Sequence, residues 1–252
     1  MISNILENLS IQTGFPFGHY HYTGGDKIFQ VPWFIGPAYL ATGYLAWVVA
    51  TVLLGDVRRN SPWLTTIGTP IIGAFAMTAW DVALDPATSI NHAWIWENGG
   101  GFFGVPLANF LGWTFTVYLF MQVFALYLRS RGPLPTAQPD RTTASDLQGV
   151  LLYAATAISF FPKFFTGERT TVTDAVGATW CTGDIHETSV LLTVYGMFFI
   201  ALLALLRIAQ RRTTQRRRRR RSTQSSGWSR TRHAYPHSGP VATSGLAKVL
   251  LA

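Results

Sequence analysis

The sequence predicts an all-α integral membrane protein, a bundle of about five transmembrane helices. Of its 252 residues 48% are hydrophobic and only 13% are charged, whereas about 25% of the residues in an ordinary soluble domain are charged. In addition, five stretches of the chain reach the roughly 20 apolar residues that a helix needs to cross a hydrocarbon core about 30 Å thick. These two observations favour the membrane class over a soluble one.

The first segment, residues 1–13, is too short to span the bilayer and is typical of a short helical or interfacial element. We expect residues 1–206, this first segment included, to form a single polytopic membrane domain. Its spans are expected at about 34–54, 62–84, 104–128, 146–165 and 188–206. Pro86 directly follows Asp85 and predicts the end of the second span, because proline disfavours helix in the residue before it. Pro162 interrupts the end of the fourth span.

The distribution of Lys and Arg predicts which loops face the cytoplasm, since cytoplasmic loops are enriched in these residues. Arginines follow the first, third and last spans, at Arg58, Arg59, Arg129, Arg131, Arg141 and Arg207. Residues 86–103 contain no Lys or Arg, and residues 163–187 set two basic groups against four acidic ones. We therefore expect a multi-pass protein of a bacterial or archaeal-type plasma membrane, with these two loops outside and the C-terminus in the cytoplasm.

The C-terminal segment 207–252 accounts for the net charge of +8, because it holds twelve Lys or Arg residues and no acid. Its Arg-, Ser- and Gly-rich composition buries little apolar area, which predicts a disordered cytoplasmic tail. The six arginines at 216–221 are typical either of a nucleic-acid patch or of an anchor that attracts anionic lipid. Their place after a span favours anionic lipid, and no nucleic-acid partner is expected.

Asp81 and Asp85 are the prime candidates for a functional site. Ionisable side chains within a span are costly and usually face a protein-lined cavity. The two residues lie four positions apart at the outer end of the second span, so both carboxylates project from one helix face. The alternative is a solvated helix end, which fits Asp85 better than Asp81, because Asp81 lies one turn deeper.

The histidine and cysteine residues give weaker evidence for a functional site than the two aspartates do. His19 and His21 form an HxH pair that His92 or His186 would have to complete as a metal site. A membrane metal enzyme of the desaturase type needs many more histidines, so no metal is expected. Cys181 is the only cysteine, which excludes an intramolecular disulfide.

Three segments carry a family resemblance: TGFPFGHYHYT at 13–23, AWDVALDP at 79–86 and WIWENGGGFFGVPLANFLGW at 94–113. In this order and spacing they resemble the membrane-embedded carotenoid biosynthesis proteins that include the gamma-carotene and bisanhydrobacterioruberin-type carotenoid hydratases. The resemblance covers about residues 5–128 strongly and the last two spans by hydropathy. Relatives usually have one or more further helices before the position of Glu7, and the tail after Arg211 has no counterpart in them.

The resemblance implies addition of water across the terminal trisubstituted C=C of a linear carotenoid end, which needs no redox cofactor. A carboxylic acid kept neutral in an apolar site beside a second carboxylate is a suitable proton source. Asp81 and Asp85 fit that pair, with their roles as acid and base left open. Glu97, a third catalytic candidate, or Asn109 would position the water. Contacts with the substrate or its carbocation are expected from Glu7, Phe17, His19, Tyr20, Trp80, Trp94, Trp96, Phe102, Phe103, Asn109 and Trp113.

Two other classes of function stay open. A transporter or proton-coupled channel would also place Asp81 and Asp85 in the membrane, as a proton relay, although the sequence has no visible internal repeat. A non-catalytic carotenoid-binding or assembly protein would keep the aromatic groove, including Trp94 and Trp96, without a strong acid. Aromatic residues near a membrane surface are also common as interfacial belt residues. The expected partners are a linear carotenoid or isoprenoid lipid and the surrounding membrane lipids.

Overall fold

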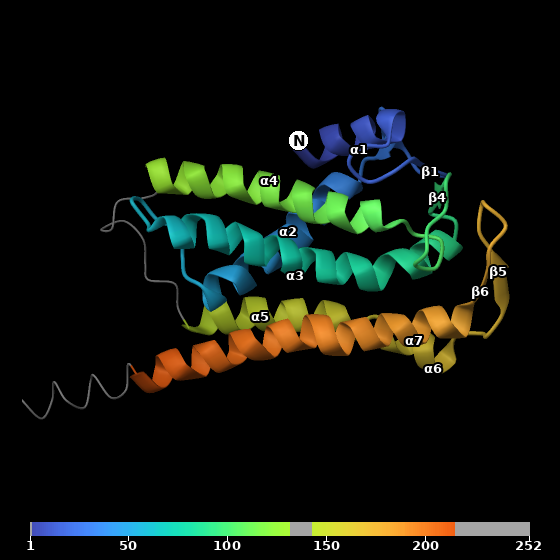
Figure 1. The fold of residues 1–252 in the computed structure, drawn as a ribbon. Coiled ribbons are helices and arrows are strands. Elements are labelled where there is room, and N and C mark those ends of the chain that lie inside the picture. The colour runs from blue at the N-terminus through green and yellow to red at the C-terminus, as the bar shows by residue number, and fades with distance from the viewer. Residues whose placement is uncertain (1, 132–142, 215–252) are drawn as a thin grey trace, which may run out of the picture. The chain divides into compact units, whose positions relative to one another are not determined.

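The computed structural model describes residues 2–131 and 143–214, and helices dominate this part of the chain (Figure 1). Five helices are long and apolar enough to cross a membrane, which confirms the predicted fold class. Residues 207–214, predicted as the beginning of a disordered tail, are instead helical. From residue 215 on, the predicted tail lies outside the described residues, as does Arg141. The five helices are α2 (Ile35–Leu53), α3 (Trp63–Ile90), α4 (Leu107–Arg131), the pair α5 (Thr143–Ile158) and α6 (Phe161–Thr166), and a helix over Thr182–Thr214 that contains α7 (Thr182–Leu192) and the π-helical turn η1 (Thr193–Phe198).

Helix α3 is central, since α2, α4 and α7 all pack against it. Small residues on α3 make this possible: Ala74, Ala76 and Ala83 are buried, and a Cβ at Gly73 would lie against Sδ of Met121 on α4. Small residues at helix contacts let backbones approach closely in a membrane bundle. Large apolar side chains point away from these contacts and remain exposed, as expected for surfaces that face lipid.

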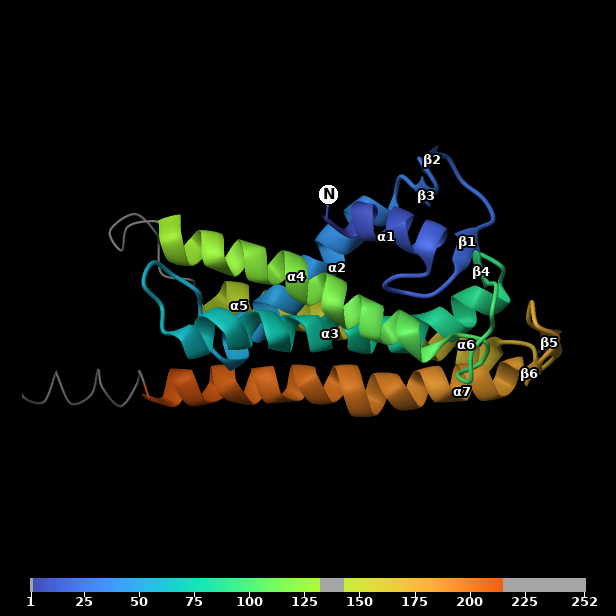
Figure 2. The ribbon, with the colours of Figure 1, turned by 45° about the horizontal axis from the view of Figure 1, so that its top comes forward.

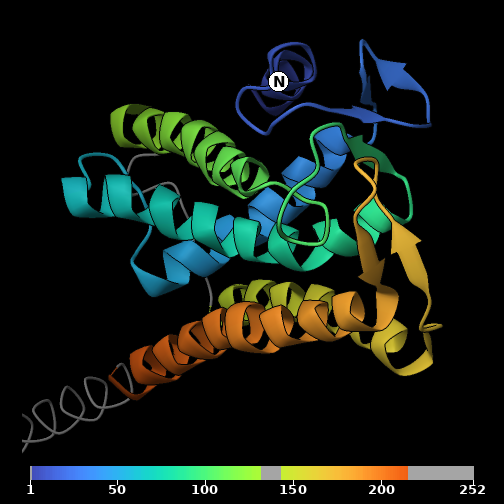
Figure 3. The same ribbon diagram turned by 45° about the vertical axis from the view of Figure 1, so that its right-hand side comes forward.

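Short strands and a short helix gather at one end of the long helices (Figure 2). Helix α1 (Ile2–Thr13) packs against α2 and α4. Strand β1 (Tyr20–Tyr22) pairs antiparallel with β4 (Trp94–Trp96). Two further hairpins are β2 (Lys27–Ile28) with β3 (Val31–Pro32), and β5 (Thr171–Thr173) with β6 (Thr179–Cys181). Figure 3 shows β4 and the β5–β6 hairpin near the end of α3.

The predicted end of the second span at Asp85 is wrong. Helix α3 continues through Pro86 to Ile90. Proline removes one helical N–H, so the carbonyl of Val82 loses its usual i−4 donor. Two residues on, Thr88 Oγ1 donates to the carbonyl of Leu84 at 2.8 Å. Asp85 and Ala87 are buried on either side of the proline. Tertiary packing therefore outweighs the local preference, as is common for prolines in membrane helices.

The last helix also begins earlier than predicted, at Thr182 rather than at residue 188. Its first turns contain Asp184, His186 and Glu187. A hydropathy criterion leaves these polar residues out, although they continue the same helix. In contrast, the break after Ile158 and the new helix at Phe161 agree with an interruption near Pro162.

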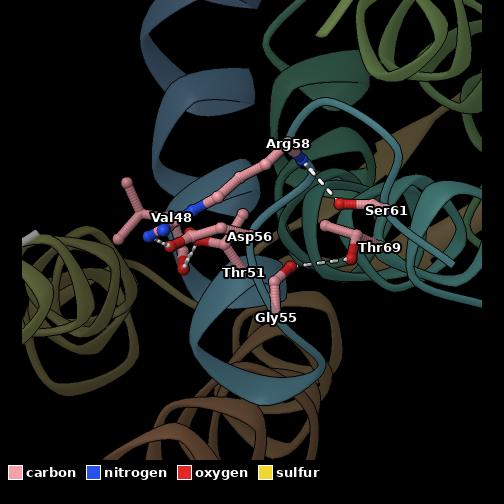
Figure 4. Close-up of polar contacts among 7 residues, drawn as sticks. All are labelled: Val48, Thr51, Gly55, Asp56, Arg58, Ser61 and Thr69. Carbon is pink, nitrogen blue, oxygen red and sulfur yellow. Dashed lines mark hydrogen bonds and ion pairs between the residues drawn. The ribbon is translucent and has the colours of Figure 1, made fainter. Parts of the chain in front are cut away.

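At the opposite end from the strands, the connection between α2 and α3 is held by polar contacts (Figure 4). Thr69 Oγ1 donates to the carbonyl of Gly55 at 3.1 Å. The backbone N–H of Arg58 donates to Ser61 Oγ at 2.7 Å, and the Arg58 guanidinium lies 3.2 Å from the carboxylate of Asp56. The loop that the arginine pattern assigns to the cytoplasm is thus ordered by its own side chains.

Orientation in the membrane can be tested with single cysteines in a Cys181→Ser background. Val176 in the β5–β6 hairpin is 53% exposed, and Arg59 in the α2–α3 connection is also exposed. We expect a membrane-impermeant maleimide to label Val176→Cys in intact cells and Arg59→Cys only after permeabilisation, because the arginine pattern predicts that the α2–α3 connection faces the cytoplasm. The reverse pattern would invert the orientation.

Candidate functional site

An apolar cavity of about 260 Å³ lies at the end of the helices that carries the strands. Its wall combines α1, β1, the first turns of α2 and α4, the last turns of α3, and β4. Most of the wall is aromatic or aliphatic, and its polar side chains are few. Its residues include Glu7, Phe17, Tyr20, Tyr22, Tyr39, Trp80, Asp81, Asp85, Trp94, Trp96, Asn109 and Trp113.

Asp81 and Asp85 both lie in this wall and are buried. Asn109, in the first turn of α4, donates its amide to Oδ2 of Asp85 and lies 3.4 Å from Oδ2 of Asp81. Among the described residues, Oδ1 of Asp81 has no hydrogen-bond partner. Two carboxylates that share one amide donor in an apolar wall repel each other when both are ionised, which favours a pair that holds one proton.

A third carboxylate, Glu7 of α1, is 3% exposed and lines the same cavity. The hydroxyls of Tyr20 and Tyr22 both donate to its Oε2, the latter at 3.0 Å, and the hydroxyl of Tyr39 donates to its Oε1 at 2.8 Å. Burial raises the pKa of Glu7 above its ordinary value, and the three hydroxyl hydrogen bonds oppose that rise. Glu7 is therefore both fixed in place and surrounded by donors.

The pairing of β1 with β4 positions the aromatic part of the wall. Alternate residues of a strand point to opposite faces, so Tyr20 and Tyr22 face inward, whereas His21 faces outward. Tyr20 lies opposite Trp96 and Tyr22 opposite Trp94. Their ring centroids are 4.8 Å and 6.0 Å apart, respectively. The same alternation thus supplies two hydroxyl donors and two indoles to one cavity.

Helix α4 adds a second aromatic contact. Trp113 stacks on Tyr39 with ring centroids 4.6 Å apart and an angle of 6° between the planes. Phe17 lies edge-on to Trp113 at 6.4 Å. These contacts join the segment that follows α1 to α2 and α4 around the cavity and hold the Tyr39 hydroxyl toward Glu7.

The structure brings ten of the expected site residues into one cavity wall and leaves four outside it. Glu97 is exposed beyond the end of β4, where its Oε1 lies 3.2 Å from Nδ1 of His21. His19 is exposed as well. Phe103 lines a different hollow, and Phe102 lines a third on the surface of α3 and α4. The end of β4 explains why Glu97 lies outside the cavity. Trp94 and Trp96 lie in the cavity wall, and the strand ends at Trp96.

Sequence reasoning missed Tyr22 and Tyr39. The Tyr-His-Tyr alternation at 20–22 was a usable signal for Tyr22, because alternate positions of a strand share a face. For Tyr39 the signal was its hydroxyl within an apolar span, since a buried tyrosine hydroxyl usually has a partner. That partner, Glu7, comes from a different helix and could not be read from local sequence.

A second, more polar hollow of about 140 Å³ shares Trp94 and Trp96 with the apolar cavity. Its wall includes His92, Thr173 and Asp174. Within residues 2–131 and 143–214, the indole N–H groups of Trp94 and Trp96 are buried without a hydrogen-bond partner. The same part of the chain contains no group of three or more His, Cys, Asp or Glu side chains that could hold a metal ion.

The model of a family described as carotenoid biosynthesis protein matches residues 1–176, and this range contains the whole wall of the apolar cavity. Neither a curated protein nor a solved structure matches the chain.

Gly112 of α4 provides a test of how the N-terminal segment closes the cavity. A Cβ at this position would lie 2.7 Å from the carbonyl oxygen of Pro16 and 2.8 Å from Cδ1 of Phe17. Gly112→Ala should therefore lower the thermal midpoint in detergent, because overpacking typically costs about 1–3 kcal/mol. The control is Gly36→Ala in α2, where a Cβ meets nothing within 4 Å. Equal midpoints for the two variants would contradict this packing.

Proposed function

Because the chain belongs to the carotenoid biosynthesis protein family, we propose that it is a membrane enzyme that adds water to the terminal C=C of a linear carotenoid end. The observation that carries this proposal is the Asp81–Asp85–Asn109 group in the wall of an apolar cavity. Hydration of an alkene begins with proton transfer from a positioned acid, and a carboxylic acid that apolar surroundings keep protonated can serve as that acid.

The volume of the cavity fits one end of a long substrate molecule and not the whole molecule. Its volume of about 260 Å³ is below the roughly 300–1,000 Å³ of pockets that enclose a whole drug-sized ligand. Its rim includes Phe34 and Ala38 beside the beginning of α2, and both are exposed. An apolar rim on a spanning helix gives a lipid-soluble polyene a sideways route from the bilayer, with most of its length left outside.

The chemistry balances without a redox cofactor. The Asp81–Asp85 pair gives its proton to the less substituted alkene carbon, and the π electrons form the new C–H bond. The cation that results is tertiary, and the faces of nearby rings such as Trp80 and Trp113 stabilise positive charge. The oxygen of a water molecule then forms the C–O bond and loses a proton. The sum is one added water and a tertiary alcohol.

We also propose three features of the protein's membrane context. Residues 1–206 form one polytopic membrane domain. The charge of the segment 207–252 supports a cytoplasmic tail that attracts anionic lipid. The substrate is a linear carotenoid or related isoprenoid lipid, which the family membership supports.

Replacement of the aspartates tests the reaction. In a bacterium that accumulates lycopene, wild-type protein should yield a pigment heavier by one water. Asp81→Asn and Asp85→Asn keep the shape but remove the acid, so product per folded molecule should fall by about 10²- to 10⁴-fold, the usual contribution of positioned acid–base groups.

Asp184→Asn is the matched control, because Asp184 is exposed on α7 and does not line the cavity. Its product per folded molecule should equal that of wild type. Near-normal turnover in both cavity variants would contradict the paired-acid mechanism. Solute flux without any new pigment would instead favour the transporter alternative.

A further inference from the structure

The cavity wall contains two separate clusters of polar side chains, and the proposed proton transfer to the alkene uses only one of them. The first is the Asp81–Asp85 pair with Asn109. The second is Glu7 with its three tyrosine hydroxyls. Hydration requires two proton transfers, one to the alkene and one from the attacking water. The second polar group is therefore a candidate for the second transfer.

The hydrogen bonds of Glu7 are those that an ionised carboxylate accepts, and they leave room for one more donor. Every described partner is a tyrosine hydroxyl that donates, two to Oε2 and one to Oε1. An ionised carboxylate offers about four acceptor positions, two on each oxygen. One position on Oε1 therefore remains, beside the hydrogen bond from Tyr39. A water molecule that donates there would be held against the cavity.

The surroundings also hold Glu7 in one place. Tyr20 packs against Trp96, Tyr22 against Trp94, and Tyr39 stacks on a tryptophan of α4. Each hydroxyl thus comes from a ring that is itself fixed by a second ring. A base must be positioned within hydrogen-bond reach of the proton that it removes, and a carboxylate fixed by three such donors satisfies that requirement.

We propose that Glu7 is the base that accepts the proton of the attacking water, which rests on the hydration proposed above. As the water oxygen bonds to the tertiary cation, one of its O–H bonds breaks and the proton passes to Oε1 of Glu7. The Asp81–Asp85 pair has lost one proton and Glu7 has gained one. Proton exchange with water between turnovers restores both, so the cycle adds one water and consumes nothing else.

Two physical features agree with this role. A carboxylate close to the cation stabilises it by Coulomb attraction, which is strong in an apolar cavity. Burial also raises the pKa of Glu7, which makes it a better proton acceptor than an ordinary carboxylate. The aspartate pair and Glu7 thus have complementary tasks: the pair on α3 is the proton source, and Glu7 on α1 is the proton acceptor.

Deuterium separates the two proton transfers. In D₂O the wild-type protein should convert lycopene into an alcohol with one new C–D bond. In Glu7→Gln the aspartate pair still delivers a deuteron, but water does not capture the cation efficiently. The carbon that received the deuteron instead returns its original proton to the aspartate pair, and the C=C forms again. Unhydrated carotenoid should then carry deuterium, and the ratio of alcohol to deuterated alkene should fall by about 10²-fold. Asp81→Asn should lose both products.

The ratio of alcohol to deuterated alkene does not depend on how much protein folds. It therefore distinguishes a base from a residue that only stabilises the fold. A folded Glu7→Gln protein with the wild-type ratio would overturn the assignment, as would one that loses both products. If Glu7→Gln does not fold, Glu7→Asp must lower the same ratio, and an unchanged ratio would equally overturn it. Wild-type protein that forms neither product would instead refute the hydration on which the assignment rests.

Discussion

The structure depends on the cost of a carboxylate in an apolar membrane cavity. Such a group needs donors around it, because an unpaired charge away from water costs several kcal/mol or more. Three carboxylates share this cavity, and three elements of its wall supply hydrogen-bond donors to them. The first turn of α4 supplies Asn109, and β1 and α2 supply tyrosine hydroxyls. The positions of these elements are therefore linked through the charges that they surround.

The fold was largely predictable because the bilayer imposes one simple requirement on length and apolarity. The juxtaposition of Asp81 and Asp85 was also predictable, since a spacing of four residues determines a shared helix face. The donors were not. Asn109 is 28 positions from Asp81, and Tyr39 is 32 positions from Glu7. Such contacts arise from how helices pack, and no local pattern specifies which partner a buried polar group finds.

Two local rules gave wrong or incomplete expectations for related reasons. The rule that proline ends a helix overlooked the packing that keeps α3 helical through Pro86. The proximity of Glu97 to Trp94 and Trp96 in sequence implied a shared site, but a strand turns successive residues to opposite faces. Three-residue strands such as β1 and β4 carry too few residues for their alternation to stand out within an aromatic-rich loop.

The β1–β4 pairing has a consequence for how the protein is made. The two strands are more than 70 positions apart in the chain, and two spanning helices lie between them. The segment that carries β1 leaves the ribosome before α2 and α3, yet its partner strand exists only after both of those helices have been synthesised. During that interval Glu7 lacks the folded neighbours that surround it in the finished protein. Assembly of the cavity is therefore a late event, and early membrane insertion of α2 and α3 must proceed without it.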